Sequence, residues 1–100
     1  MNLLEKYSHA IANICAKHKV KRLYAFGSVL SRNFSERSDI DLMVDFDLID
    51  LQYYADNYFS LKFALEETFH RSVDLLEEKA VKNPYFRNAV EQQRKLIYGN

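Results

Sequence analysis

The sequence is short of the residues that make disulfides, linkers and membrane anchors. It has one cysteine, one proline, two glycines and no tryptophan among 100 residues. A single cysteine excludes an internal disulfide and fits a reducing compartment, and so little glycine and proline leaves little room for a flexible linker. No apolar run approaches the ~20 residues of a membrane span, and the amino terminus lacks a charged-then-apolar signal. We therefore expect a cytoplasmic protein with one domain over residues 1–100.

Net charge is absent as well, although the charges are unevenly placed. The 14 Lys and Arg balance the 14 Asp and Glu. Acidic residues dominate the segment 39–78, whereas the segments before and after it are basic. With no net positive charge and no recognisable reading motif, we expect no direct binding to nucleic acid.

Two closely spaced carboxylates stand at the start of an alternating segment. Apolar and polar residues alternate from Asp39 to Phe46, which predicts a strand over 40–46. Asp39 and Asp41 then point the same way, and their repulsion calls for a compensating positive charge. Mg²⁺ suits such a place, because it binds one or two carboxylates together with phosphates and water. The alternative is a solvent-exposed strand face that happens to carry acids, and the presence of Asp45 on the same face suggests this.

A Gly-Ser pair lies ten residues before Asp39 and follows a strand predicted over 23–26. Gly27 can take backbone angles closed to other residues and lets a ligand approach closely. Ser28 can cap a following helix, whose free N–H groups suit a phosphate. A plain strand-to-helix turn would look the same. If the two strands pair antiparallel, however, the Gly-Ser pair and both carboxylates face one small space.

A third acid is expected at the same place. Apolar residues recur at helical spacing over 51–69, starting at Leu51, and a helix of this length suits a crossover connection. The next strand, over 72–76, should then lie parallel to the second strand. This arrangement brings Asp74 beside the other two acids. The alternative for Asp74 is a surface acid on an edge strand.

Helices are also predicted at both ends of the chain. The first covers 2–18, with Cys15 on its apolar stripe. The last begins at Asn83-Pro84, a typical cap and first-turn pair, and its stripe continues to about Tyr98, before Gly99.

The helix over 51–69 is unusually aromatic. Tyr54 and Tyr58 follow its apolar stripe, so core packing explains them. Tyr53 and Phe59 lie off the stripe and are expected at the surface, which indicates association with a partner in a homo- or hetero-oligomer. The alternative is a role in stacking on bases, which the sequence favours less.

Together these residues resemble a known family. The series Gly27-Ser28, ten residues, Asp39-Ile40-Asp41 and Leu42-Met43-Val44 is similar to the signature of the DNA polymerase beta-like nucleotidyltransferase superfamily. Asp74, in Val73-Asp74-Leu75-Leu76, matches the third carboxylate of that superfamily, and the ending from Asn83 to Arg87 resembles its minimal nucleotidyltransferase (MNT) branch. The resemblance implies an α/β (α+β) nucleotidyltransferase fold. Its small mixed three-stranded sheet would be packed with helices in the order α-β-α-β-α-β-α.

The resemblance also implies a reaction. Asp39, Asp41 and Asp74 would be the catalytic acids and would bind Mg²⁺, while Gly27 and Ser28 would bind the nucleotide. MNT proteins resemble antitoxins that pair with HEPN-domain RNase toxins and silence them by transferring AMP from ATP to a toxin tyrosine. The resemblance therefore implies a Mg-dependent protein adenylyltransferase antitoxin in a prokaryotic cytoplasm.

Two departures from the family pattern leave other functions open. Val29 stands where many members carry Arg, and Asn33 stands where many carry Gly. Arg32 or Arg37 could supply the missing phosphate contact, although a solvated loop charge explains each of them better. One alternative is a non-catalytic module that caps its toxin or binds nucleotide, and the intact acids argue against it. Another is a transferase acting on a small molecule, and the missing second domain argues against that.

Overall fold

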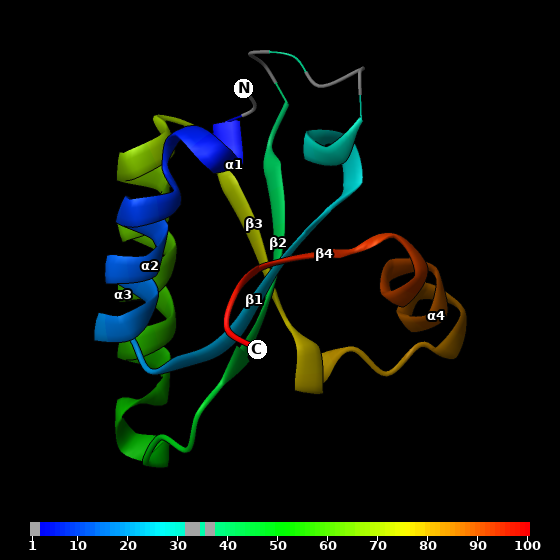
Figure 1. Cartoon of the computed structure of the whole chain (residues 1–100). Coiled ribbons are helices and arrows are strands. Elements are labelled where there is room, and N and C mark those ends of the chain that lie inside the picture. Colours follow the sequence, from blue (N-terminus) through cyan, green and yellow to red (C-terminus); the bar gives the residue numbers. More distant parts are fainter. Residues whose placement is uncertain (1–2, 32–34, 36–37) are drawn as a thin grey trace.

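Helices cover both faces of a four-stranded sheet in this computed structural model, which describes residues 3–31, 35 and 38–100 (Figure 1). The strands are β1 (Val20–Phe26), β2 (Ile40–Phe46), β3 (Val73–Glu77) and β4 (Lys95–Tyr98), and their order in the sheet is β3-β2-β1-β4. β1 pairs antiparallel with β2 and β4, and β2 pairs parallel with β3. The antiparallel and parallel pairings predicted for the first three strands are confirmed.

The helices divide between the two faces of the sheet. The short α1 (Leu3–Lys6), α2 (Ser8–Lys17) and the long α3 (Leu51–Phe69) lie on one face, and α4 (Pro84–Gln93) lies on the other (Figure 1). Two short 3-10 turns, η1 (Gly27–Leu30) and η2 (Glu78–Ala80), follow β1 and β3. Within the described ranges, no helix is both long and apolar enough to cross a membrane.

The main core lies between the sheet and the α2/α3 layer. The alternating β2 side chains that face this layer, Ile40, Leu42, Val44 and Phe46, are all buried. Each such burial stabilises the fold by ~1.5–3 kcal/mol. Cys15 of α2 is fully buried in the same core, and burial raises the pKa of its thiol to about 12. The thiol therefore stays protonated and inert, as expected of a core cysteine.

β3 is an edge strand whose outer backbone groups are bonded by side chains of α3. The backbone N of Val73 donates to Oε2 of Glu66 at 2.9 Å, and Oη of Tyr58 donates to the carbonyl oxygen of Leu75 at 2.6 Å. These two bonds occupy an edge that would otherwise be open to another strand.

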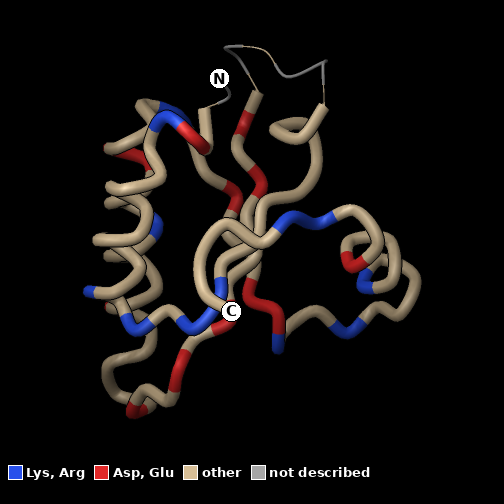
Figure 2. Tube along the Cα trace, viewed as in Figure 1, with Lys and Arg blue, Asp and Glu red and all other residues tan. Residues whose placement is uncertain are grey.

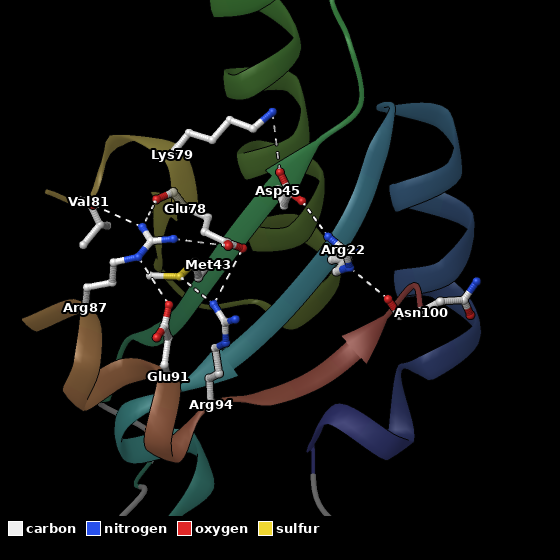
Figure 3. A network of polar contacts seen from close by, with 10 residues as sticks. All are labelled: Arg22, Met43, Asp45, Glu78, Lys79, Val81, Arg87, Glu91, Arg94 and Asn100. Atoms are coloured by element: carbon white, nitrogen blue, oxygen red, sulfur yellow. Dashed lines mark hydrogen bonds and ion pairs between the residues drawn. The ribbon is translucent and has the colours of Figure 1, made fainter. Parts of the chain in front are cut away.

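Ion pairs hold α4 against the sheet (Figure 3). Glu78, directly after β3, lies 3.6 Å from both Arg87 and Arg94, and Arg87 also pairs with Glu91 at 3.3 Å. The guanidinium carbon of Arg94 lies 3.9 Å from the ring centre of Tyr24 on β1, a cation–π contact. One carboxylate thus connects two points of α4 to the end of β3.

Under α4 lies a second, smaller core. Phe26, Met43 and Val90 are buried together, with Tyr24, Leu76 and Val81 packed around them. This core lies between α4 and the sheet, and α4 covers only part of that sheet face (Figure 1).

The last helix is shorter than expected, which corrects the number of strands from three to four. α4 ends at Gln93, and the residues up to Tyr98 form β4 against β1 instead of further helical turns. Arg94 already has extended angles, φ −65° and ψ 146°, at the point where its side chain meets Glu78 and Tyr24. Pairing with the open edge of β1 therefore outweighs the helical spacing of Ile97.

Three smaller expectations are also wrong. The first helix is broken at Tyr7, whose ring packs edge to face against Phe69 with 5.7 Å between centroids. Leu51 is 90% exposed, because the start of α3 projects beyond the end of the sheet (Figure 1). Asp45 is only 7% exposed, because Arg22 at 3.0 Å and Lys79 at 3.8 Å compensate its charge on a face that was expected to be wet.

The aromatic side chains of α3 lie as predicted. Tyr54 and Tyr58 pack against the main core, whereas Tyr53 and Phe59 are 59% and 50% exposed. Phe63, one turn further along, is also exposed and stacks on Phe59 with 6.0 Å between centroids.

Replacing Asn83 with Ala should destabilise the fold by about 1 kcal/mol. The Oδ1 of Asn83 accepts hydrogen bonds from the backbone N of Tyr85 at 2.9 Å and of Phe86 at 3.2 Å, as expected of this cap. Urea unfolding followed by circular dichroism measures the loss. Asn88→Ala, at an exposed position of the same helix, is the control and should stay within about 0.5 kcal/mol of wild type. Equal effects of the two changes would contradict the capping role.

Candidate active site

The three predicted acids lie at one end of the sheet, on the face that α4 partly covers. The strand register pairs Phe26 with Asp41 and pairs Asp41 with Asp74, so these residues form one row across β1, β2 and β3. Asp39 directly precedes β2. Asp39 and Asp74 are exposed and Asp41 is half-buried. Acidic positions gather at this end of the strands, beside the η1 turn (Figures 1 and 2).

Asp41 shows the strongest electrostatic effect in this row. Burial raises the pKa of its carboxyl above the usual range, and the negative charges of Asp74 and Asp39 raise it further. The carboxylates of Asp74 and Asp39 are therefore each close enough to Asp41 to repel its negative charge. A cation bound among them would relieve this repulsion.

Gly27 lies directly against Asp41. Its φ is +74°, a region that side chains rarely adopt, and a Cβ at this position would collide with Oδ2 of Asp41. The backbone of the turn thus comes as close to the carboxylate as a residue without a side chain permits. A ligand held by the carboxylate would meet the peptide groups of this turn.

The turn after β1 differs in detail from the expected helix cap. Phe26, rather than Ser28, is the N-cap residue of η1, and its side chain makes no capping hydrogen bond. Ser28 lies inside η1, where its carbonyl oxygen accepts hydrogen bonds from the backbone N and the Oγ of Ser31 at 2.9 and 3.0 Å. The first N–H groups of a helical turn have no partner within that turn, so they remain suited to an anion.

The departure at Val29 has a structural basis. The Val29 side chain is 9% exposed and packs in the main core. It therefore contributes to stability and supplies no charge beside the acids. The other loop positions singled out in the sequence, Arg32, Asn33 and Arg37, lie outside the described residues.

The donor set fits a hard divalent cation such as Mg²⁺. Asp39, Asp41 and Asp74 offer only carboxylate oxygens, which Mg²⁺ prefers, and no sulfur or imidazole. Among the residues that the structure describes, no three His, Cys, Asp or Glu side chains are gathered closely enough to hold a metal ion by themselves. A cation here would need further oxygens, which the phosphates of a nucleotide and water supply at Mg²⁺ sites.

A pair of aromatic rings borders the acid row. The helical spacing of the sequence did not identify this pair. Phe26, the row neighbour of Asp41, meets Phe86 of α4 edge to face, with 6.4 Å between centroids and 79° between ring planes. Phe86 is 43% exposed. Its spacing in the sequence assigns it to the packing stripe of the last helix, and spacing alone does not show that much of the ring stays open.

This fold and site define a class of enzymes that transfer part of a nucleotide to an acceptor. The chain belongs to the family described as Polymerase beta, Nucleotidyltransferase, whose model matches residues 9–100. It is a nucleotidyltransferase. A protein of Methanocaldococcus jannaschii with the provisional name protein adenylyltransferase is 38% identical over 82 residues, which cover 82% of this chain and 79% of that protein.

Solved structures show the same fold. A protein provisionally described as a minimal nucleotidyltransferase superposes with a TM-score of 0.78 at 31% identity and covers 95% of both chains. A toxin–antitoxin structure with AMP-PNP superposes with a TM-score of 0.72 at 23% identity, and the match covers 93% of this chain and 73% of that one. A complex of tri-AMPylated Shewanella oneidensis HEPN toxin with MNT antitoxin gives a TM-score of 0.67 at 22% identity. The match covers 98% of this chain and 74% of that one.

Gly27→Ala should destabilise the protein by about 1–2 kcal/mol, because alanine is strained at a positive φ. The added Cβ also displaces the Asp41 carboxylate, so we expect nucleotidyl transfer to be lost. Urea unfolding measures the first effect. The double variant Gly27→Ala/Asp41→Ala removes the collision and should recover part of the stability, since residues in contact are not additive. Strict additivity of the two changes would contradict the contact.

Asp41→Asn should stabilise the metal-free protein. Because the pKa of Asp41 is raised, folding favours its protonated form, and stability falls as pH rises through that raised pKa. Asn mimics the neutral form, so in EDTA at pH 7.5 we expect a gain of up to about 1 kcal/mol. Thermal unfolding measures this gain.

Adding Mg²⁺ with a nucleotide analogue should raise the melting temperature of wild type and leave that of Asp41→Asn unchanged. Asp47→Asn, at an exposed aspartate just after β2, is the control and should behave as wild type. If Asp41→Asn were less stable than wild type in EDTA, the repulsion between Asp41 and its neighbouring carboxylates would be refuted.

Proposed function

We propose that this nucleotidyltransferase is an antitoxin that transfers AMP from ATP to a tyrosine of a HEPN-domain RNase toxin in a prokaryotic cytoplasm. The observation that carries the proposal is the row of Asp41 and Asp74, with Asp39 beside it, against the Gly27 turn. The provisional name of the M. jannaschii relative supports a protein acceptor. The similarly folded MNT antitoxin in complex with an AMPylated HEPN toxin supports the identity of that acceptor.

In this proposal the η1 turn binds the phosphates that leave. Gly27 has no side chain to hold a triphosphate away from the acids. The N–H groups at the start of the turn, and the hydroxyl of Ser28, would donate hydrogen bonds to the β- and γ-phosphate oxygens. Binding at this point would place the α-phosphorus over the carboxylates.

The three acids would hold Mg²⁺, Asp39 and Asp41 at one ion and Asp74 at a second. When bound, Mg²⁺ neutralises the triphosphate and stabilises the attacking and leaving oxygens. The tyrosine oxygen forms a bond to the α-phosphorus as the bond from that phosphorus to the bridging oxygen of the β-phosphate breaks. Pyrophosphate leaves, and Asp74, which is exposed, would help to activate the hydroxyl, whose proton passes to the surrounding water. No covalent intermediate on the enzyme is required.

The openness of the site favours a large acceptor over a small one. Asp39 and Asp74 are both exposed, and Asp74 lies on the edge strand β3. A protein acceptor brings its own surface to such a place and excludes water on docking, whereas a small acceptor needs walls that enclose it.

A non-catalytic capping module is the second candidate function. The burial of Val29 favours it, because the position where many family members carry Arg gives the site no cation. Such a module would block its toxin by binding alone, and its effect would survive loss of the acids.

Intact-mass spectrometry of the HEPN-domain protein encoded beside this one distinguishes the two candidates. After incubation with this protein, ATP and Mg²⁺, we expect its mass to increase by whole AMP units. Asp39→Asn/Asp41→Asn should abolish the increase, and Tyr→Phe at the modified position of the acceptor should abolish it as well. An unchanged mass in a stable complex would instead establish the capping module.

A further inference from the structure

We propose that Phe86 stacks on the base of the bound nucleotide and gives the site a preference for purine nucleotides. This inference rests on the proposed function, because it requires the phosphates to lie at the acid row and the η1 turn. It adds a binding residue on α4 to a site otherwise built from β1, η1, β2 and β3.

The position of Phe86 follows from two contacts. Phe26 is the register partner of Asp41 and directly precedes Gly27, so its ring borders the place where we put the phosphates. Phe86 meets that ring with 6.4 Å between centroids. One strand pairing and one ring contact therefore connect Phe86 to Asp41.

The orientation of the ring leaves one of its faces clear of Phe26. Because Phe26 and Phe86 meet edge to face, at least one face of the Phe86 ring is free of Phe26. The side chain is 43% exposed although it adjoins the buried trio of Phe26, Met43 and Val90. An aromatic ring that is anchored on one side and open on the other is how proteins commonly bind bases.

The start of the helix that carries the ring is also held in place before any ligand arrives. The backbone N of Phe86 donates to Oδ1 of Asn83, and the next residue, Arg87, pairs with Glu78 and donates to the carbonyl oxygens of Glu78 and Val81 (Figure 3). One turn later, Val90 is buried against the sheet. Because the backbone is fixed in this way, only the side chain of Phe86 has to be ordered when a base binds, which limits the loss of entropy.

Stacking on a ring discriminates by size rather than by hydrogen bonding. A purine covers more of a phenyl ring than a pyrimidine does, and every base has a face that can stack. We therefore expect ATP to bind more tightly than UTP, and we expect the difference to depend on the planar face of Phe86.

Isothermal titration calorimetry with Mg²⁺ and α,β-methylene analogues of ATP and UTP tests this. The methylene group replaces the bridging oxygen at the bond that transfer breaks, so binding is measured without turnover. Phe86→Leu keeps an apolar side chain against Phe26 but removes the ring, and Phe86→Trp enlarges it. Tyr85→Leu makes a similar change at the neighbouring residue, which is 87% exposed.

We expect Phe86→Leu to weaken binding of the ATP analogue by about 5- to 100-fold and to weaken binding of the UTP analogue less. The preference for the ATP analogue over the UTP analogue should therefore become smaller. Phe86→Trp should bind at least as tightly as wild type, which also excludes a general folding defect at this position. Tyr85→Leu should bind as wild type does.

Three results would overturn the inference. In the first, wild type and Phe86→Leu bind the ATP analogue equally. In the second, Tyr85→Leu loses as much affinity as Phe86→Leu. In either case binding that depends on Asp39 and Asp41 would leave the proposed function standing. In the third, wild type binds neither analogue, and the proposed function fails together with the role of Phe86.

Discussion

The contact between the Gly27 backbone and the Asp41 carboxylate is the constraint on which the rest of the structure depends. It forms because β1 ends where the antiparallel β2 begins, and a side chain at position 27 would displace the Asp41 carboxylate. The parallel crossover through α3 then adds Asp74 to the same row. The result is a place where negative charge accumulates and the pKa of Asp41 rises. A fold that tolerates such repulsion without a compensating cation gives up stability at this candidate site.

The face of the sheet that carries the acid row is only partly covered by α4. α4 covers the middle of the face and buries Met43 and Phe26 under Val90, while Glu78 holds the helix through Arg87 and Arg94. Further along the same face, Asp45 is neutralised by Arg22 and Lys79. Acids on one face of one strand therefore have two different environments. Asp45 lies in a paired, closed region, and Asp41 lies beyond the cover of α4 with other carboxylates as neighbours.

Much of this arrangement follows from local sequence patterns. Alternation from residue 40 to 46 predicts both the β2 strand and its buried face, and the length of the helix over 51–69 predicts the parallel β3. These two elements suffice to bring Asp74 beside Asp41. β4 was missed because Ile97 fits a helical stripe, and only the open edge of β1 favours a strand. The burial of Asp45 depends on Arg22 and Lys79, which are distant in sequence. Partners of that kind cannot be read from periodicity.

The central claim is that the Gly27 turn and the acid row together bind the triphosphate of a nucleotide. A crystal structure of the wild-type protein with Mg²⁺ and α,β-methylene ATP tests it most directly. The account predicts a cation about 2.1 Å from an oxygen of Asp41 and from a phosphate oxygen, with the outer phosphates against the backbone of Gly27 and Ser28. A nucleotide bound elsewhere on the chain, with no cation at Asp41, would contradict it.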